Sequence, residues 1–265
     1  MDAEERSIIK NGNNKMLIND LLSAMEKLED APIEEVIEGR HLIAITSRNT
    51  GLCTRVGSGV DDLIENFHVP SESAKELGAM IIKNNFDFHD EPAYAMAAIN
   101  SLFPIPENVI NLKAQDMILK YGKGKKVAVI GHFPFVEKIR SEFQNLWVLE
   151  KNPKPGDLPA ESAELVIPEA DFIAITATTL INGTCAGILK LVPEKAFVIM
   201  LGPSTPFAPC FFDWGIDALA SCVVTDKKKA FARIREGYPS KWLDGIKHVI
   251  WTKDSLLFSK DNLTN

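Results

Sequence analysis

The stretch KVAVIGHFP, residues 126–134, contains the pattern that decides the fold of most of the chain. Its apolar run is not interrupted by polar residues, which indicates a strand covered on both faces, and Pro134 is well placed to begin a helix. Further runs of this kind follow as LWVLE, DFIAITA, AFVIML and ALASCVVT, with helical or loop segments between them. The chain from residue 106 onward is therefore predicted to form a doubly wound parallel sheet, a Rossmann-like α/β domain.

The chain before this region has a different organisation. In MLINDLLSAMEKLED the spacing of the apolar residues predicts an amphipathic helix with one buried stripe, made by Leu17, Leu21, Met25 and Leu28. IEEVIEGRHLIAITS predicts two antiparallel strands, and GLCTRV adds a third. Two more helices are expected, one over residues 71–83 with Ser71 as its cap and one over EPAYAMAAINSLF with Asp90 as its cap.

The segment PIPENVI, which begins at Pro104, marks a boundary because two prolines in three residues end a helix and stiffen the crossing. We therefore predict a small α+β domain over residues 1–105 and the Rossmann-like domain over residues 106–265. The helix before the boundary is apolar almost all round, so Asn100 is expected to need a polar partner inside the protein.

Composition restricts the classes of partner. The formal net charge is -7 and the isoelectric point is about 5.4, so the chain lacks the excess of positive charge that binds nucleic acid, and no nucleic-acid partner is expected. The N-terminal residues lack the features of a signal peptide, and no apolar run is long enough for a membrane helix, so no membrane partner is expected. The four cysteines have no C-x-x-C spacing, and we expect a reducing, cytoplasmic location: Cys53, Cys185, Cys210 and Cys222.

Ligands of open parallel sheets bind outside the carboxyl ends of the strands, so the residues after each strand are candidates. The first strand is followed by Gly131, His132, Phe133 and Pro134, a turn with one glycine that lacks the G-x-G-x-x-G fingerprint. The next strand ends at Glu150, where Rossmann-like domains place an acceptor for ribose hydroxyls; the alternative is a solvated loop acid.

Two further strand ends carry small polar residues. TTLINGT follows one strand and LGPSTPFAP the next, and their glycines permit close backbone approach while prolines lower the entropy lost on ordering a loop. The alternative is that loops favour these residues for turn chemistry alone. The candidate ligand-binding residues at these two ends are Thr178, Asn182, Gly183, Thr184, Gly202, Pro203, Ser204, Thr205 and Pro206.

Three other signals are weaker. YGKGKK precedes its strand, whereas a phosphate-binding loop follows one. In FDFHDE, a metal site from Asp87, His89 and Asp90 lacks any recognised ligand spacing. DKKKAFARIREG resembles a basic nucleic-acid helix, but in an acidic chain a solvated helix that starts at Asp226 is the favoured interpretation.

With GHFPFVEKIR, VLEKNP, ITATTLINGT and LGPSTPFAP in hand, the chain resembles a family of prokaryotic proteins described as "putative heavy-metal chelation". The resemblance implies an N-terminal domain like that of enolase, joined to a Rossmann-like domain, with a candidate active site in the cleft between them. It implies the same strand-end residues as site residues, with contributions from Asn100 and from the loop of residues 48–51. No metal-ligand cluster is evident in the sequence.

Three functional hypotheses follow. The first is a cytoplasmic enzyme or small-molecule-binding protein with an interdomain site, linked to heavy-metal chelation or chelator metabolism. The second is a transferase that uses a nucleoside cofactor such as S-adenosylmethionine, and the third is a non-catalytic regulatory or scaffold protein. His132 and Glu150 are the candidate catalytic residues, and the cofactor is open between a metal ion and a nucleoside-like ligand. The sequence does not decide whether the protein is an enzyme, its oligomeric state or the orientation of His132.

Overall fold

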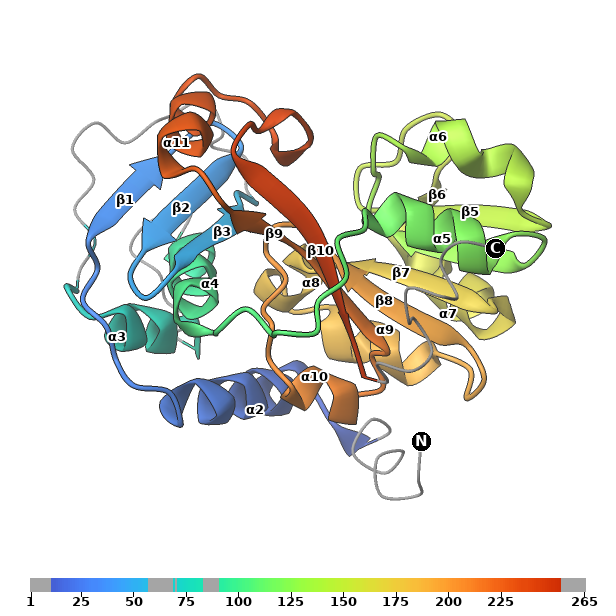
Figure 1. The fold of residues 1–265 in the computed structure, drawn as a ribbon. Coiled ribbons are helices and arrows are strands. Elements are labelled where there is room, and N and C mark those ends of the chain that lie inside the picture. Colours follow the sequence, from blue (N-terminus) through green and yellow to red (C-terminus); the bar gives the residue numbers. More distant parts are fainter. Residues whose placement is uncertain (1–10, 57–68, 70, 83–90, 254–265) are drawn as a thin grey trace.

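The computed structural model describes residues 11–56, 69, 71–82 and 91–253. The fold is mixed α/β: a three-stranded antiparallel sheet is followed by a seven-stranded, mostly parallel sheet with helices (Figure 1). The predicted fold class is therefore confirmed. None of the helices in the described part of the chain has the length and the apolar composition that crossing a membrane requires.

The small sheet has the strand order β1-β2-β3, with β1 over Glu35–Glu38, β2 over Leu42–Thr46 and β3 over Thr50–Thr54. Every residue of β2 is buried because both faces of the sheet are covered. Helix α4 (Glu91–Leu102) packs on β2 and β3, and the far face is covered by α11 (Lys227–Arg235), which comes from the other end of the chain.

The contact between α11 and the small sheet is close. Phe231 and Ile234 of the helix share a buried cluster with Ile37 and Leu42 of the sheet. A Cβ atom added to Gly39, in the turn between β1 and β2, would lie 2.1 Å from the carbonyl oxygen of Ile234. The segment DKKKAFARIREG is thus a packed helix, and its predicted start is confirmed because the Asp226 side chain accepts a hydrogen bond from the Lys229 amide.

Among the described residues, the first part of the chain also contains α2 (Asn14–Glu26) and α3 (Ala74–Ala79), with the short 3-10 helix η1 (Met80–Ile82) after α3. The prediction that Ser71 caps a helix over residues 71–83 was wrong by two residues. Ser73 is the cap: its backbone is extended, and its side chain accepts a hydrogen bond from the Glu76 amide. Asp90, the predicted cap of α4, lies outside the described residues.

The large sheet has the strand order β10-β9-β8-β7-β4-β5-β6. Neighbouring strands are parallel except β10, which pairs antiparallel with β9. The strands span Lys126–Ile130 (β4), Asn145–Glu150 (β5), Leu158–Pro159 (β6), Phe172–Thr176 (β7), Phe197–Leu201 (β8), Ala218–Val224 (β9) and Ile246–Thr252 (β10). The five strands that the sequence predicted are confirmed; β6 and β10 were not predicted.

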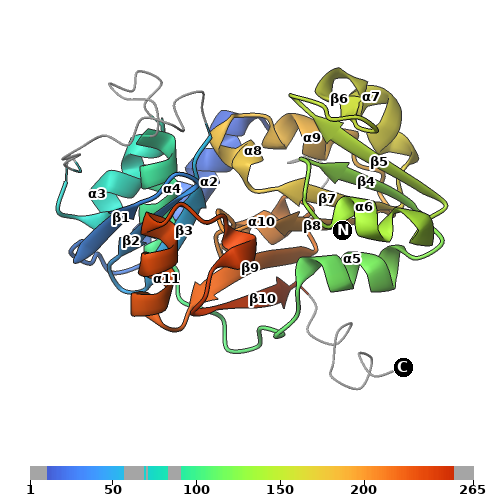
Figure 2. The ribbon, with the colours of Figure 1, turned by 90° about the horizontal axis from the view of Figure 1, so that it is seen from above.

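Helices cover both faces of the large sheet, as the view from above shows (Figure 2). The helix α5 (Ala114–Gly122) and the single turn α6 (Val136–Ile139) share one buried cluster with the sheet. The opposite face carries α7 (Ala163–Val166), α8 (Thr178–Ile181), α9 (Cys185–Leu191) and α10 (Cys210–Asp213). The short 3-10 helix η5 (Ser240–Trp242) precedes β10.

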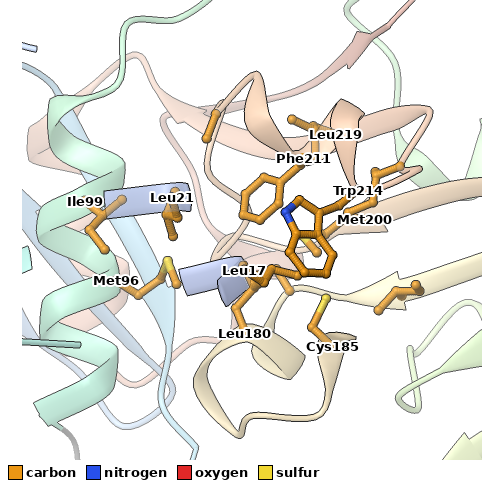
Figure 3. Close-up of a cluster of buried hydrophobic side chains, with 14 of the residues drawn as sticks. Leu17, Leu21, Met96, Ile99, Leu180, Cys185, Met200, Phe211, Trp214 and Leu219 are labelled. Carbon is orange, nitrogen blue, oxygen red and sulfur yellow. The ribbon is translucent and has the colours of Figure 1, made fainter. Parts of the chain in front are cut away.

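Helix α2 joins the two sheets through one hydrophobic core. Leu17 and Leu21 lie between residues of α4 and the cluster around Phe211 and Trp214 (Figure 3). The Trp214 Nε1–H donates to Asp20 Oδ2 at 2.8 Å, and the Ala186 amide donates to Asn14 Oδ1 at 2.8 Å. The border between residues 105 and 106 stays a prediction, and the core runs across it without a break.

Candidate functional site

The chain reverses its direction across the large sheet between β4 and β7. From β4 it continues outward to β5 and β6, then returns to β7 on the other side of β4. Such a reversal leaves a crevice at the carboxyl ends of the strands, where ligands of open α/β sheets bind. A cleft of about 910 Å³ lies at this position.

Most of the predicted site residues line this cleft: Gly131, His132, Phe133, Glu150, Thr178, Asn182, Thr184, Gly202, Pro203 and Ser204. The first part of the chain contributes Thr54, Val56 and Pro92, whereas the resemblance implied Asn100 and residues 48–51. Those residues line a separate cavity of about 220 Å³ together with Thr205. Pro134 lines a third cavity, and Gly183 and Pro206 line none of the three.

His132 is held by a buried carboxylate that the sequence analysis did not identify. Its Nδ1 lies 2.9 Å from Asp157 Oδ2 and 3.1 Å from Oδ1. The Asp157 side chain is fully buried, whereas 14% of the His132 side chain is exposed. Because a carboxylate only accepts hydrogen bonds, Nδ1 carries the hydrogen, and Nε2 of the neutral ring is left as an acceptor. The imidazole is therefore oriented and its tautomer is fixed.

Asp157 lies in the loop between β5 and β6, after Gly156, which has a φ of 93°. Its Oδ2 also accepts a hydrogen bond from the Lys154 amide at 3.0 Å. The only local signal for this residue was the Gly-Asp pair, which is typical of any turn. Its approach to His132 is a tertiary contact that spacing along the chain does not reveal.

Glu150 has a role that neither interpretation of the sequence contained. Its Oε2 accepts from the His132 amide at 2.8 Å, and its Oε1 accepts from the Lys151 amide at 2.7 Å. The carboxylate thus ties the turn after β4 to the end of β5. Since each carboxylate oxygen has two acceptor positions, one on each remains for a ligand.

Two glycines give the backbone close access to the cleft. Gly131 has a φ of 98° and Gly202 a φ of 118°, a conformation that residues with a Cβ rarely adopt. A Cβ on Gly131 would lie 3.0 Å from Thr176 Cγ2. The hydroxyls of Thr176 and Thr178 lie 3.0 Å apart beside this glycine, so this part of the cleft offers hydrogen-bonding groups on a compact surface.

The loop that follows β8 also connects the two sheets. Ser204 Oγ accepts from the Thr54 amide at 2.9 Å, and the Cys53 thiol donates to it at 3.3 Å. The expected partner for Asn100 exists: its Nδ2 donates to the carbonyl of Leu52 at 2.8 Å and to that of Pro203 at 3.4 Å. The loop LGPSTPFAP therefore connects the large sheet to the small sheet as well as forming part of the cleft wall.

The described residues do not provide a metal centre. Within residues 11–56, 69, 71–82 and 91–253, no group of three or more His, Cys, Asp or Glu side chains is placed to hold a metal ion. The weak candidates Asp87, His89 and Asp90 lie outside this part of the chain.

This geometry defines a mixed α/β protein with a cleft at the switch point of its large sheet. The chain belongs to the DUF364 family, whose model bears the description "Putative heavy-metal chelation" and matches residues 113–249. The family resemblance found in the sequence is thereby confirmed.

The chain is also similar to the "Uncharacterized protein MJ0500" of Methanocaldococcus jannaschii, with 28% identity over 156 residues. This match covers 55% of the chain and 59% of that protein, which is less than two thirds of its length. Crystal structures of DUF364 proteins of unknown function show the same fold. The protein from Desulfitobacterium hafniense matches with a TM-score of 0.73 at 24% identity, covering 89% of this chain and 98% of that one. The protein from Pyrococcus horikoshii matches with a TM-score of 0.73 at 20% identity, covering 89% and 100%.

Proposed function

We propose that the cleft binds a small metabolite and that His132 accepts a proton from it or donates one to it. The observation that carries this proposal is the 2.9 Å contact between His132 Nδ1 and the buried Asp157 carboxylate. An imidazole that is oriented through one nitrogen presents the other to a ligand as a general base, and its protonated form as a general acid. The protein would then be an enzyme rather than a passive binding protein.

The family description favours a metabolite linked to heavy-metal chelation. Because the described residues do not provide a cluster of metal ligands, we propose that the donor atoms belong to the bound small molecule. The protein would make, modify or hold a chelator. Free thiols at Cys185, Cys210 and Cys222 support the expectation that it works in the reducing cytoplasm.

The other residues of the cleft position this reaction. Glu150 fixes the backbone of His132, and Asp157 holds its ring, so the imidazole cannot turn away without breaking the contact to Asp157. Gly131 and Gly202 let the ligand approach the backbone, while Thr178 offers a hydroxyl. Thr54 and Pro92 place the first part of the chain over the cleft, which supports an interdomain site.

A nucleoside cofactor is the second candidate, favoured by the strand order. Counted from β4, the parallel strands run 3-2-1-4-5-6, the order of Rossmann-like dinucleotide-binding sheets, and Glu150 ends the second of them. S-adenosylmethionine binding at millimolar concentration that Glu150→Gln abolishes would support this candidate. The absence of binding would rule out this candidate.

Among the described residues, the exposed large apolar side chains lie on separate elements, so no observation favours the scaffold hypothesis.

The orientation of His132 is tested by NMR of the imidazole nitrogens. We expect the neutral tautomer with hydrogen on Nδ1 in the native protein and a loss of this preference in Asp157→Asn. The matched control is His41→Gln in the turn between β1 and β2, outside the cleft, which should leave the His132 signals unchanged. Hydrogen on Nε2 in the native protein would overturn the proposed role.

The ligand is sought by native mass spectrometry of the freshly purified protein against its denatured mass. We expect an additional mass from a small organic molecule, and its mass identifies the ligand class. With that molecule as the substrate, His132→Gln should remove turnover while retaining binding, whereas His41→Gln should retain both. Turnover that survives in His132→Gln would refute the proton-transfer role, and a stoichiometric metal with no organic molecule would refute the chelator proposal.

A further inference from the structure

A second cavity, of about 600 Å³, adjoins the cleft on the face of the sheet that carries α5 and α6. The two spaces share part of their walls: Phe133, Leu201, Gly202, Pro203 and Ser240. A volume of this size lies within the range of small-molecule sites. His132 does not line this cavity, so its properties can be considered apart from the proposed reaction.

The charges around this cavity have one sign. Lys113, Lys138 and Lys241 line it, and none of the described aspartates and glutamates does, although the whole chain has a net charge of -7. The three lysines come from the start of α5, from α6 and from η5, which are far apart in the sequence. Cations brought together from separate elements, without acidic residues among them, favour an anion.

The carboxylates closest in sequence have other partners. Asp116 Oδ1 accepts from Gln115 Nε2 at 3.4 Å, and Glu137 Oε1 is paired with Arg140 Nη2 at 2.9 Å. The charge of Lys113 also reaches the interior. The pKa of His248 in the cavity wall is lowered mainly by burial and further by the charge of Lys113, while Asp116 has a smaller effect in the opposite direction.

The wall also offers aromatic and neutral surfaces. The rings of Phe133 and Phe135 are stacked with centroids 5.4 Å apart, and Trp242 is 58% exposed although it is a large apolar side chain. Lys241 Nζ lies 4.0 Å from the centre of the Trp242 ring, so a cation and an aromatic face stand together. Burial raises the pKa of the Cys222 thiol to about 12, which keeps the interior free of a thiolate charge.

We propose that this cavity binds the aromatic, anionic part of a small molecule: a planar ring rests against Trp242 and Phe133, and its carboxylate lies among the three lysines. Stacking and cation attraction are both available at Trp242 and Lys241. This inference goes beyond the proposed function, because it requires no proton transfer at His132. A ligand that extends past Gly202 and Pro203 would occupy both the cavity and the cleft.

The test compares two probes of the same shape, 2-naphthoate and the neutral 2-naphthalenemethanol, by isothermal titration calorimetry. We expect the carboxylate to bind about tenfold more tightly, since exposed ion pairs contribute modestly and three of them act together. The preference should shrink as the salt concentration rises. Equal affinity of the two probes, or no binding of 2-naphthoate at millimolar concentration, would overturn the proposal.

Matched variants locate the site. Replacing Lys113, Lys138 and Lys241 by glutamine should remove the preference for the carboxylate. The control replaces three exposed lysines outside the cavity, Lys123, Lys190 and Lys195, by glutamine, which changes the net charge equally and should preserve the preference. A control that loses as much affinity as the cavity variant would show that only overall charge matters. His132→Gln should bind 2-naphthoate as the native protein does, so this proposal and the proposed function fail separately.

Discussion

Replacing Ser204 by alanine tests whether the loop after β8 holds the two sheets together. The Ser204 side chain is buried, and its Oγ accepts from the Thr54 amide at 2.9 Å and from the Cys53 thiol at 3.3 Å. Alanine leaves the Thr54 N–H without this acceptor. Loss of one partner of a buried hydrogen bond costs about 1–3 kcal/mol, and the half-buried position of Thr54 places the expected loss at about 1–2 kcal/mol.

The assay is urea unfolding followed by circular dichroism, combined with hydrogen exchange of the Thr54 amide. For a chain of this length, the expected loss of unfolding free energy corresponds to a Tm lower by about 2–5 °C. The Thr54 amide should exchange faster in the variant than in the native protein, because its bond to Ser204 is the contact that is removed.

The matched control is Thr205→Val in the same loop. Thr205 is also buried, but its Oγ1 has no hydrogen-bond partner among the described residues. Valine has nearly the same shape and removes an unpaired hydroxyl, so the variant should be as stable as the native protein or more stable. The reasoning is refuted if Ser204→Ala changes stability by less than about 0.5 kcal/mol, or if Thr205→Val destabilises the protein as much.

Three further outcomes are expected. Gly131→Ala should destabilise the protein by about 1 kcal/mol or more in urea unfolding and weaken ligand binding in the cleft, because Gly131 has a φ of 98° and the new Cβ would lie 3.0 Å from Thr176. Unchanged stability and binding in this variant would contradict the need for glycine. Burial raises the pKa of Asp217, so its ionised form lowers the stability of the folded protein at pH 7. Asp217→Asn should therefore be more stable than the native protein at pH 7, and a series of unfolding curves should show that this gain is lost as the pH falls below about 4. A gain in stability that does not depend on pH would count against this cause. In a Cys53→Ser background, thiol labelling at pH 8 should be slow in the native state and complete in urea, because burial raises the pKa of the remaining thiols, Cys185, Cys210 and Cys222, to about 12. Fast native labelling would be inconsistent with these raised pKa values.

The extent to which the sequence predicted the fold depends on how local the signal is. The central strands were predicted because both of their faces are covered by the same chain, which leaves unbroken apolar runs such as VAVI in β4. The edge strand β10 was missed because its sequence IKHVIWT mixes charged and apolar residues. The strand β6 has two residues and no pattern of its own.

The sequence predicted the candidate site residues that lie at strand ends, but not those that only the tertiary fold brings into the cleft. Gly131, His132 and Glu150 follow strand ends, so a general rule about parallel sheets found them. Asp157 reaches His132 from a separate loop, and no spacing predicts that contact. The first part of the chain contributes Thr54 of β3 rather than Asn100 of α4, because tertiary packing, which spacing along the sequence leaves open, decides which residue reaches the cleft.

The packing of α11 on the small sheet has a consequence for the growing chain at the ribosome. The strands β1, β2 and β3 are complete at Thr54, but the helix that covers their outer face begins at Lys227, roughly 170 residues later. At translation rates of about 5–20 residues per second, that interval lasts about 10–35 s. During this time the apolar side chains of Ile37 and Leu42 lack their final partner, so the nascent protein exposes an apolar surface that is open to non-native contacts until α11 has been synthesised.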